Sequence, residues 1–273
     1  MGRNLIPMLA KKYKIYSTFR NSKILFKNKN VINLKIDFKK KFRLPKNIFT
    51  LIHLASCSPP KFTPKLSLKN NTLIDKNIFY QSRINNIKKI IYFSSISVYK
   101  KNQININEKS KLNKQDDYGY SKILGEKYLK NNFDKNTTRI IIRLSSVLGK
   151  ESKNNFISQL SKKIIQNQNI YIPKNNPKYN SCIHIKDLIF FTKKLLNFKK
   201  TGLFTINLCS KNPTQISKLN KLMKSELKSK SKILQTKKVL IPKYSNYLAK
   251  KNFGFKPKTV LGTIKLFCKD LKS

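Results

Sequence analysis

The sequence predicts an α/β fold, a parallel sheet covered by helices, with a small C-terminal part. Two runs rich in β-branched and other apolar residues, over residues 90–93 and 139–149, have the composition of buried strands. Between them, residues 118–131 have the composition of a helix. A length of 273 residues suits one such domain with an appendage, or two modest domains.

The chain is strongly basic, with 60 Lys and Arg against 11 Asp and Glu and a formal net charge of +49. Such a balance ordinarily indicates a nucleic-acid or anionic-membrane partner. Lys is, however, spread evenly along the chain, and Arg is rare. A dedicated nucleic-acid surface would cluster its cations and favour Arg. We therefore expect no specific nucleic-acid partner, only weak and salt-sensitive adhesion to polyanions.

Neither a metal site nor a disulfide framework is predicted. The chain has two histidines and no Cys-x-x-Cys, and its cysteines are far apart in sequence. No apolar run approaches the roughly 20 residues that span a bilayer, and residues 5–10 are too short for the apolar part of a secretion signal. We expect reduced thiols, no membrane partner and a cytoplasmic location. The cysteines are Cys57, Cys182, Cys209 and Cys268.

Hydroxyl and phenol side chains form the most informative pattern. Ser95 stands where the strand over residues 90–93 ends. Tyr118 and Lys122 are four residues apart at the start of the predicted helix, so both lie on one helix face. A neighbouring ammonium favours the phenolate form of a Tyr, which suits a general acid or base. With Ser95 holding the substrate oxygen, the expected chemistry is proton transfer at a carbonyl or alcohol carbon.

The residues around Ser95, Tyr118 and Lys122 complete a longer sequence pattern, made up of Ser94–Tyr99, Glu108, Asp117–Lys122 and Gly125–Glu126. This pattern resembles the extended short-chain dehydrogenase/reductase family, the NAD(P)-dependent nucleotide-sugar epimerases and dehydratases. The resemblance runs over nearly the whole chain. It implies a Rossmann-like, doubly wound parallel sheet and a small C-terminal part that caps the substrate. It also implies Ser95, Tyr118 and Lys122 as catalytic residues, with Tyr118 and Lys122 also contacting the cofactor.

The resemblance also implies the domains and the activity. Residues 1–149 and 181–210 form the NAD(P)-binding domain, and 150–180 and 211–273 form the substrate-binding part. Epimerisation or reduction of a nucleotide sugar is expected, by hydride exchange with a Tyr acid/base, in a homodimer. Dehydration is disfavoured, because Ile96 and Ser97 stand where a dehydratase usually carries acids. The alternative is a catalytically inactive member that binds a dinucleotide or associates with RNA.

The N-terminus departs from the family pattern. The family opens with a strand and a Gly-x-x-Gly-x-x-Gly turn, whose amides hold the cofactor pyrophosphate at a helix N-terminus. Gly2 takes the place of the last glycine, and residues 3–9 are expected to form the helix that follows it. The first strand and the first two glycines are absent. We therefore expect a late start relative to the family.

Further cofactor contacts follow from the resemblance. Arg20 ends a strand over residues 14–19, where a basic residue suits the 2′-phosphate of NADP. The cofactor is therefore NAD or NADP, with NADP favoured, although Arg20 can equally be one surface cation among many. Asp37 follows the next strand and is expected near the adenine. The remaining expected contacts are Ala55, at the end of a strand over residues 49–56, with Leu144 and Val147.

Substrate contacts are assigned by position alone. Besides Ser95 they are Ser146, in a slot where the family commonly has Asn, and His184, in a segment that closes the substrate pocket. His184 is more consistent with a structural than with a catalytic role, and His53 with a packed core position. Asn71 takes the place of an Asn that steadies the active-site strand. A loop is expected over residues 58–64, and a single strand over residues 139–149.

Overall fold

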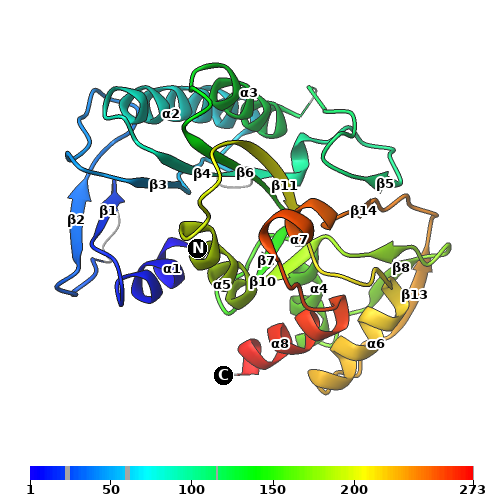
Figure 1. The fold of residues 1–273 in the computed structure, drawn as a ribbon. Helices are drawn as coiled ribbons and strands as arrows, with labels where there is room; N and C mark the ends of the chain where they lie inside the picture. Colours follow the sequence, from blue (N-terminus) through cyan, green and yellow to red (C-terminus); the bar gives the residue numbers. More distant parts are fainter. Residues whose placement is uncertain (22–24, 59–61, 115, 273) are drawn as a thin grey trace. The chain divides into compact units, whose positions relative to one another are not determined.

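The computed structural model describes residues 1–21, 25–58, 62–114 and 116–272, and Figure 1 shows its elements. The chain divides into two compact units. The first comprises residues 1–98, 113–142 and 189–205, and the second comprises 99–112, 143–188 and the rest of the chain from 206. The two units are defined by contacts within the chain, not by which residues bind the cofactor or the substrate. The predicted division into a cofactor-binding domain and a substrate-binding part stays a prediction.

The predicted α/β class is confirmed. Its main sheet has four strands in the order β11-β6-β4-β3, and β3 runs parallel to β4 with Thr50 opposite Lys89. A second parallel pair, β1 and β2, places Ile15 opposite Val31. The strands are β1 (Ile15–Phe19), β2 (Val31–Lys35), β3 (Thr50–His53), β4 (Lys89–Ser95), β6 (Thr138–Leu144) and β11 (Gly202–Leu208).

No strand hydrogen bonds join the β1–β2 pair to the four-strand sheet within the described residues, so the strand pairing is interrupted between β1 and β3. Within the described residues, β1 pairs only with β2, and β3 pairs only with β4. In a Rossmann sheet, whose own strands are ordered 3-2-1-4, the first strand lies between the second and the fourth strand. Here β1 and β3 stand in the places of that second and that fourth strand. The described residues contain no strand at that position, and the late start stays a prediction.

Helices α2 (Pro64–Ile84) and α3 (Asp117–Asn131) belong to the first unit. Thr63 caps α2 by accepting a hydrogen bond from the Leu66 amide at 3.3 Å, and Asp116 caps α3 through the Gly119 amide at 3.1 Å. A Cβ at Gly125 would overlap the Asp75 carboxylate, so α3 packs very closely on α2. Helix α1 (Gly2–Leu9) precedes β1, as expected. Residues 59–61 of the expected loop lie outside the described residues.

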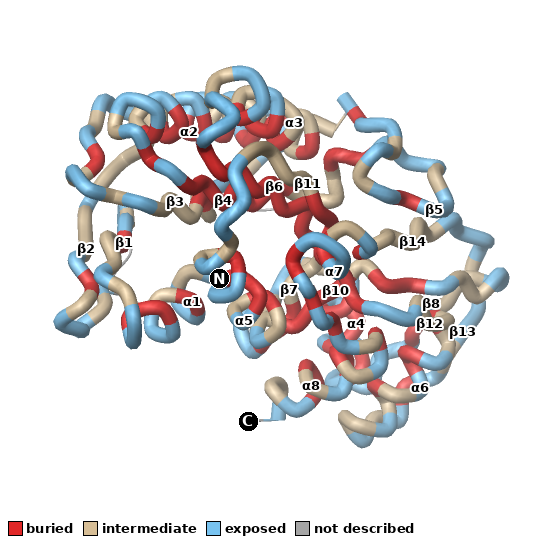
Figure 2. Tube along the Cα trace, in the orientation of Figure 1, coloured by how far each residue is buried: buried red, intermediate tan, exposed pale blue. Residues whose placement is uncertain are grey.

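Burial is most continuous along β4 and β6, as the buried stretches in Figure 2 show. Even Lys89, the first residue of β4, is buried. Its Nζ donates hydrogen bonds to the carbonyls of Leu196 at 2.6 Å and Phe198 at 2.7 Å, near the C-terminus of helix α5 (Ile185–Leu196). A cation is favourable there, because the last carbonyls of a helix lack intrahelical donors.

The second unit is built from short strand pairs and helices around its own core. Its pairs are β7 with β10 and β8 with β13, both parallel, together with β9 with β12, antiparallel, and β5 with β14, parallel. No helix in the described part of the chain is long and apolar enough to cross a membrane. The elements are β5 (Asn105–Ile106), β7 (Ser146–Leu148), β8 (Ile170–Pro173), β9 (Lys178–Tyr179), β10 (Cys182–His184), β12 (Thr214–Gln215), β13 (Ile233–Thr236), β14 (Lys243–Tyr244), α4 (Phe156–Ile165), α6 (Ile216–Glu226), α7 (Tyr247–Phe253) and α8 (Val260–Lys272).

The single strand expected over residues 139–149 is wrong, because two strands occupy this segment. β6 ends at Leu144, and β7 begins at Ser146. The Ser145 amide donates a hydrogen bond to the Leu208 carbonyl of β11 at 3.2 Å, whereas the Ser146 amide donates to the Ser181 carbonyl at 3.2 Å. The chain changes pairing partner within one residue, and hydrophobicity alone does not reveal such a change.

Candidate active site

Ser95 is the last residue of β4, as the sequence predicts, and a short 3₁₀ turn (Ile96–Val98) follows it. Its Oγ accepts a hydrogen bond from the Ser97 amide at 3.1 Å and donates one to the Ser97 Oγ at 3.2 Å. Ser95 is half-buried. The turn therefore fixes the Ser95 hydroxyl at the exit of the strand.

Tyr118 lies in the first turn of α3 and is half-buried. Its hydroxyl has no hydrogen-bond partner within the described residues, and no hydrogen bond joins it to Ser95. The next residue, Gly119, packs so closely on the Ser97 carbonyl that a Cβ there would overlap it. The turn that carries Tyr118 therefore contacts the turn that holds the Ser95 hydroxyl.

Lys122 is 2% exposed and lies one turn after Tyr118 on the same helix. Its Nζ lies 4.9 Å from the centroid of the Tyr92 ring. No hydrogen-bond acceptor for this ammonium occurs in the part of the chain that the structure describes. Since a buried charge without hydrogen bonds is unfavourable, and an ammonium has three donors, the site suits a ligand that supplies hydroxyl oxygens.

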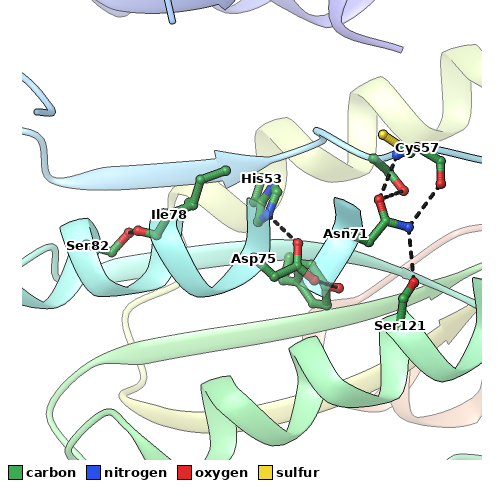
Figure 3. Close-up of polar contacts among 9 residues, drawn as sticks. His53, Cys57, Asn71, Asp75, Ile78, Ser82 and Ser121 are labelled. Atoms are coloured by element: carbon green, nitrogen blue, oxygen red, sulfur yellow. Dashed lines mark hydrogen bonds and ion pairs between the residues drawn. The ribbon is translucent and has the colours of Figure 1, made fainter. Parts of the chain in front are cut away.

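Asn71 of α2 ties α3 to the segment that follows β3. Its Oδ1 accepts a hydrogen bond from the Cys57 amide at 2.7 Å, and its Nδ2 donates to the Cys57 carbonyl at 2.9 Å and to the Ser121 Oγ at 3.0 Å (Figure 3). Ser121 in turn donates to the Tyr118 carbonyl at 2.7 Å. Asn71 therefore steadies the Tyr118 turn rather than the β4 strand that the sequence suggested, because its amide points at α3.

Sequence reasoning missed a buried array behind Lys122. Tyr92 of β4 donates a hydrogen bond to Asp75 Oδ2 at 2.5 Å, and His53 Nε2 lies 2.8 Å from Asp75 Oδ1 (Figure 3). Burial raises the pKa of Tyr92 well above its usual value, and the Asp75 carboxylate raises it further. His53 is buried, as expected. A signal was available in Asp75, one of only 11 acids, which lies one turn from Asn71 on α2.

Arg20 and Asp37, both expected to contact the cofactor, line one cavity of about 480 Å³ in the first unit. The three lysines that line this cavity together with Arg20 were not singled out from the sequence. Gly2 opens α1, and Ala55 follows β3 and is half-buried. The cavity is lined by Arg20, Asn21, Lys35, Asp37, Lys39 and Lys40.

The other expected contacts lie in the second unit. Ser146 and Val147 are half-buried in β7, and Leu144, the last residue of β6, is buried. His184 is completely buried, and its Nε2 lies 3.1 Å from Asp270 Oδ2. Burial lowers the pKa of His184, against the opposing effect of Asp270. The Lys186 amide donates to its Nδ1 at 3.3 Å, so both ring nitrogens have protein partners, which fits a structural role.

Two further residues of the motif segments, Tyr99 and Glu108, lie in one cluster with Arg143 and Asn207 in the second unit. Arg143 donates hydrogen bonds to the Tyr99 hydroxyl at 3.0 Å and the Glu108 carbonyl at 2.9 Å. The Tyr99 hydroxyl donates to Asn207 Oδ1 at 2.6 Å, and the Asn207 amide donates to Glu108 Oε1 at 2.8 Å. Burial raises the pKa of Tyr99 to about 12, although Arg143 opposes this. These residues therefore hold the fold together.

The thiols are buried. All four cysteines are free, and burial raises the pKa of Cys182 to about 12 and of Cys268 to about 11. No cluster of His, Cys, Asp and Glu suited to a metal ion occurs among the described residues.

Solved structures of known proteins share the fold of this chain. A UDP-glucuronic acid 4-epimerase from Bacillus cereus in complex with NAD matches with a TM-score of 0.83 and 18% identity over 99% of this chain and 95% of that chain. MoeE5 in complex with UDP-glucuronic acid and NAD matches with a TM-score of 0.82 and 16% identity over the same shares. RMD from Pseudomonas aeruginosa complexed with NADPH matches at 0.70 and 18% over 88% of this chain and 90% of that one.

The structural similarity confirms the Rossmann-like fold that the motifs implied. A comparison with curated protein sequences gave no match. The model of the NAD dependent epimerase/dehydratase family matches residues 1–209, which is well over half of the chain. The protein belongs to the NAD dependent epimerase/dehydratase family.

Proposed function

We propose that this protein is a nicotinamide-dependent epimerase or reductase of nucleotide sugars. The observation that carries the proposal is the Lys122 ammonium, 2% exposed and without a hydrogen-bond acceptor in the described residues, one turn from Tyr118. A ribose hydroxyl supplies the acceptor that this ammonium lacks. Of the similar solved structures, MoeE5 is in complex with NAD and UDP-glucuronic acid, and RMD is in complex with NADPH. These complexes support a nicotinamide cofactor and a nucleotide-sugar substrate for this protein.

Each residue of the site has one role in this proposal. The bound nicotinamide accepts or supplies a hydride. Tyr118 removes a proton from the sugar hydroxyl or returns it, and Ser95 holds the same oxygen by a hydrogen bond. Lys122 holds the cofactor ribose, because its ammonium can donate hydrogen bonds to the ribose hydroxyl oxygens. We assign Gly2, Ala55, Leu144 and Val147 to the cofactor and Ser146 to the substrate, as the motif positions imply. His184, which the same pattern implied as a substrate contact, is given a structural role instead, because both of its ring nitrogens have protein partners.

The proposal is tested by incubating the protein with a panel of UDP-sugars and either NAD or NADP. An epimerase interconverts two UDP-sugars without net consumption of cofactor, which chromatography detects. A reductase consumes reduced cofactor in proportion to product, which its absorbance reports. Cofactor binding without turnover on any sugar would contradict the proposal and support the inactive family member instead.

We also propose that NADP is preferred to NAD. Arg20, Lys35, Lys39 and Lys40 line the cavity beside Asp37, so four cations stand where a 2′-phosphate would be bound. Charge-assisted hydrogen bonds to phosphate are the strong ones, and Arg forms them in pairs. Exchanging Arg20 for Gln should therefore raise the dissociation constant of NADPH about tenfold.

The same exchange should leave the NADH constant within about twofold, since NADH lacks the phosphate. Both constants are measured by the fluorescence of the reduced nicotinamide. Arg83, exposed on α2, provides the control, and Arg83→Gln should change neither constant. Equal weakening of both cofactors by Arg20→Gln would contradict the assignment.

A homodimer is the assembly that we propose. Leu66, Leu73, Tyr80 and Ile84 form one apolar stripe on α2, at spacings of seven, seven and four residues, and each is at least 38% exposed. Helix α2 packs against α3, which carries Tyr118. The resembled family commonly pairs its Tyr-bearing helices into dimers, and the stripe lies on the helix beside α3, so the occupant that we propose is a second copy of this chain.

Charges on this stripe should disrupt the dimer. The double variant Leu73→Glu, Tyr80→Glu buries two carboxylates in the contact and should sediment as a monomer at concentrations where the parent is a dimer. Tyr171→Glu is the control, because Tyr171 is 57% exposed on β8 and lies outside the stripe. A parent that sediments as a monomer, or a double variant that stays dimeric, would refute this assembly.

A further inference from the structure

We propose that Tyr92 is a positioning residue for Lys122, and that Asp75 and His53 hold the Tyr92 ring in place. The Tyr92 ring attracts the buried Lys122 ammonium, a role that a carboxylate often fills for a buried cation. This inference rests on the proposed function only in that Lys122 is taken to bind the cofactor. The contact itself is a property of the protein.

The contact between Lys122 and Tyr92 has the geometry of a cation–π interaction. The Nζ atom lies 4.9 Å from the ring centroid, within the roughly 6 Å over which a ring face attracts a cation. Lys122 is 2% exposed and Tyr92 is fully buried. Cation–π contacts are strongest when they are shielded from water, so the Tyr92 ring should stabilise the buried ammonium substantially.

Asp75 fixes the orientation of the ring. The Tyr92 hydroxyl donates to Asp75 Oδ2 at 2.5 Å, and His53 Nε2 lies 2.8 Å from the other carboxylate oxygen. A phenol that donates to a carboxylate gains electron density in its ring, which strengthens the attraction for a cation. His53 Nδ1 is buried without a partner among the described residues. With a hydrogen on Nε2, the His53 ring donates to the Asp75 carboxylate, which can only accept.

Gly125 brings this array against the helix that carries Lys122. A Cβ at position 125 would overlap both the Asp75 carboxylate and the Tyr92 hydroxyl. Lys122 and Gly125 are three residues apart on α3 and therefore lie on the same helix face. The lack of a side chain at position 125 thus allows the close approach that places the Lys122 ammonium at the Tyr92 ring.

The arrangement has a consequence for ligand binding. A carboxylate partner would accept hydrogen bonds from the ammonium and compete with the ligand for its donors. An aromatic ring attracts the charge without using the donors in this way. The affinity for the cofactor should therefore depend on the ring of Tyr92 much more than on its hydroxyl.

The first measurement needs no cofactor. In protein labelled with ¹³C at the lysine Cε, the Lys122 resonance is identified by its loss in Lys122→Met, and its protons should be shifted by the ring current of Tyr92. Tyr92→Phe should keep this shift, and Tyr92→Leu should abolish it. If the leucine variant does not fold, Tyr92→Met, which fills the space flexibly, replaces it. An unshifted resonance in the parent would overturn the proposal.

The second measurement is a double-mutant cycle on the dissociation constant of NADPH. Tyr92→Leu should raise this constant roughly tenfold and Tyr92→Phe less than about threefold, and adding Tyr92→Leu to Lys122→Met should raise it no further. Tyr128→Leu is the control, since Tyr128 stacks on Phe79 in the same aromatic cluster. Additive effects in the cycle would overturn the proposal. A parent that binds no cofactor would refute the proposed function, and the resonance test would still decide the role of Tyr92.

Discussion

Replacing Tyr118 with Phe should lower turnover of the nucleotide sugar by about 10²- to 10⁴-fold, the usual contribution of a general acid or base. The ring stays in the first turn of α3, so the packing of that turn is kept. Since the Tyr118 hydroxyl has no hydrogen-bond partner in the described residues, its removal breaks no contact of the fold. The melting temperature should therefore match that of the parent.

Turnover is measured by chromatography of the UDP-sugars, and stability by thermal unfolding. Tyr120→Phe is the matched control, because Tyr120 is half-buried on the same helix, two residues further on. It should retain the activity of the parent. A Tyr118→Phe protein as active as the Tyr120→Phe protein would remove Tyr118 from the chemistry.

Replacing Asp75 with Ala should lower the free energy of unfolding by about 3 kcal/mol. Asp75 is 2% exposed, and it accepts hydrogen bonds from Tyr92 and His53, which are also buried. Its removal leaves both donors without a partner, and an unpaired buried donor is costly. Asp75→Asn should be milder, because an amide oxygen still accepts one of the two hydrogen bonds.

Urea unfolding gives both free energies. Glu226→Ala is the control, since the partners of Glu226, Lys265 and Lys272, have side chains that are 72% and 48% exposed. Exposed pairs of this kind contribute about 1 kcal/mol or less. If Asp75→Ala were no more destabilising than Glu226→Ala, Asp75 would not be the centre of the buried array.

The sequence predicted the elements that position Ser95, Tyr118 and Lys122. Ser95 ends β4 and the other two lie in the first turns of α3, because composition and residue spacing determine such local structure. The change of partner at Ser145 was not predictable in this way. Residues 139–149 are apolar throughout most of their length, and only tertiary pairing separates β6 from β7.

Side-chain pairs between distant elements were also beyond the sequence. Asp75 and Tyr92 meet because α2 packs beside β4, and neither residue belongs to a recognisable motif. Arg20 and Asp37 were singled out because each follows a predicted strand at a position where the resembled family contacts the cofactor. Lys39, which lines the same cavity, was not, since Lys is too frequent for any single one to be informative.

Hydride exchange is tested most directly with a UDP-sugar that carries deuterium at the carbon to be oxidised. Excess protein and oxidised cofactor are mixed with this sugar, the reaction is stopped with denaturant, and the nicotinamide is analysed by mass spectrometry. Deuterium on the nicotinamide of the parent protein, and far less of it with Tyr118→Phe, is the predicted result. A sugar that is converted while all of its deuterium stays off the cofactor would contradict the proposed chemistry.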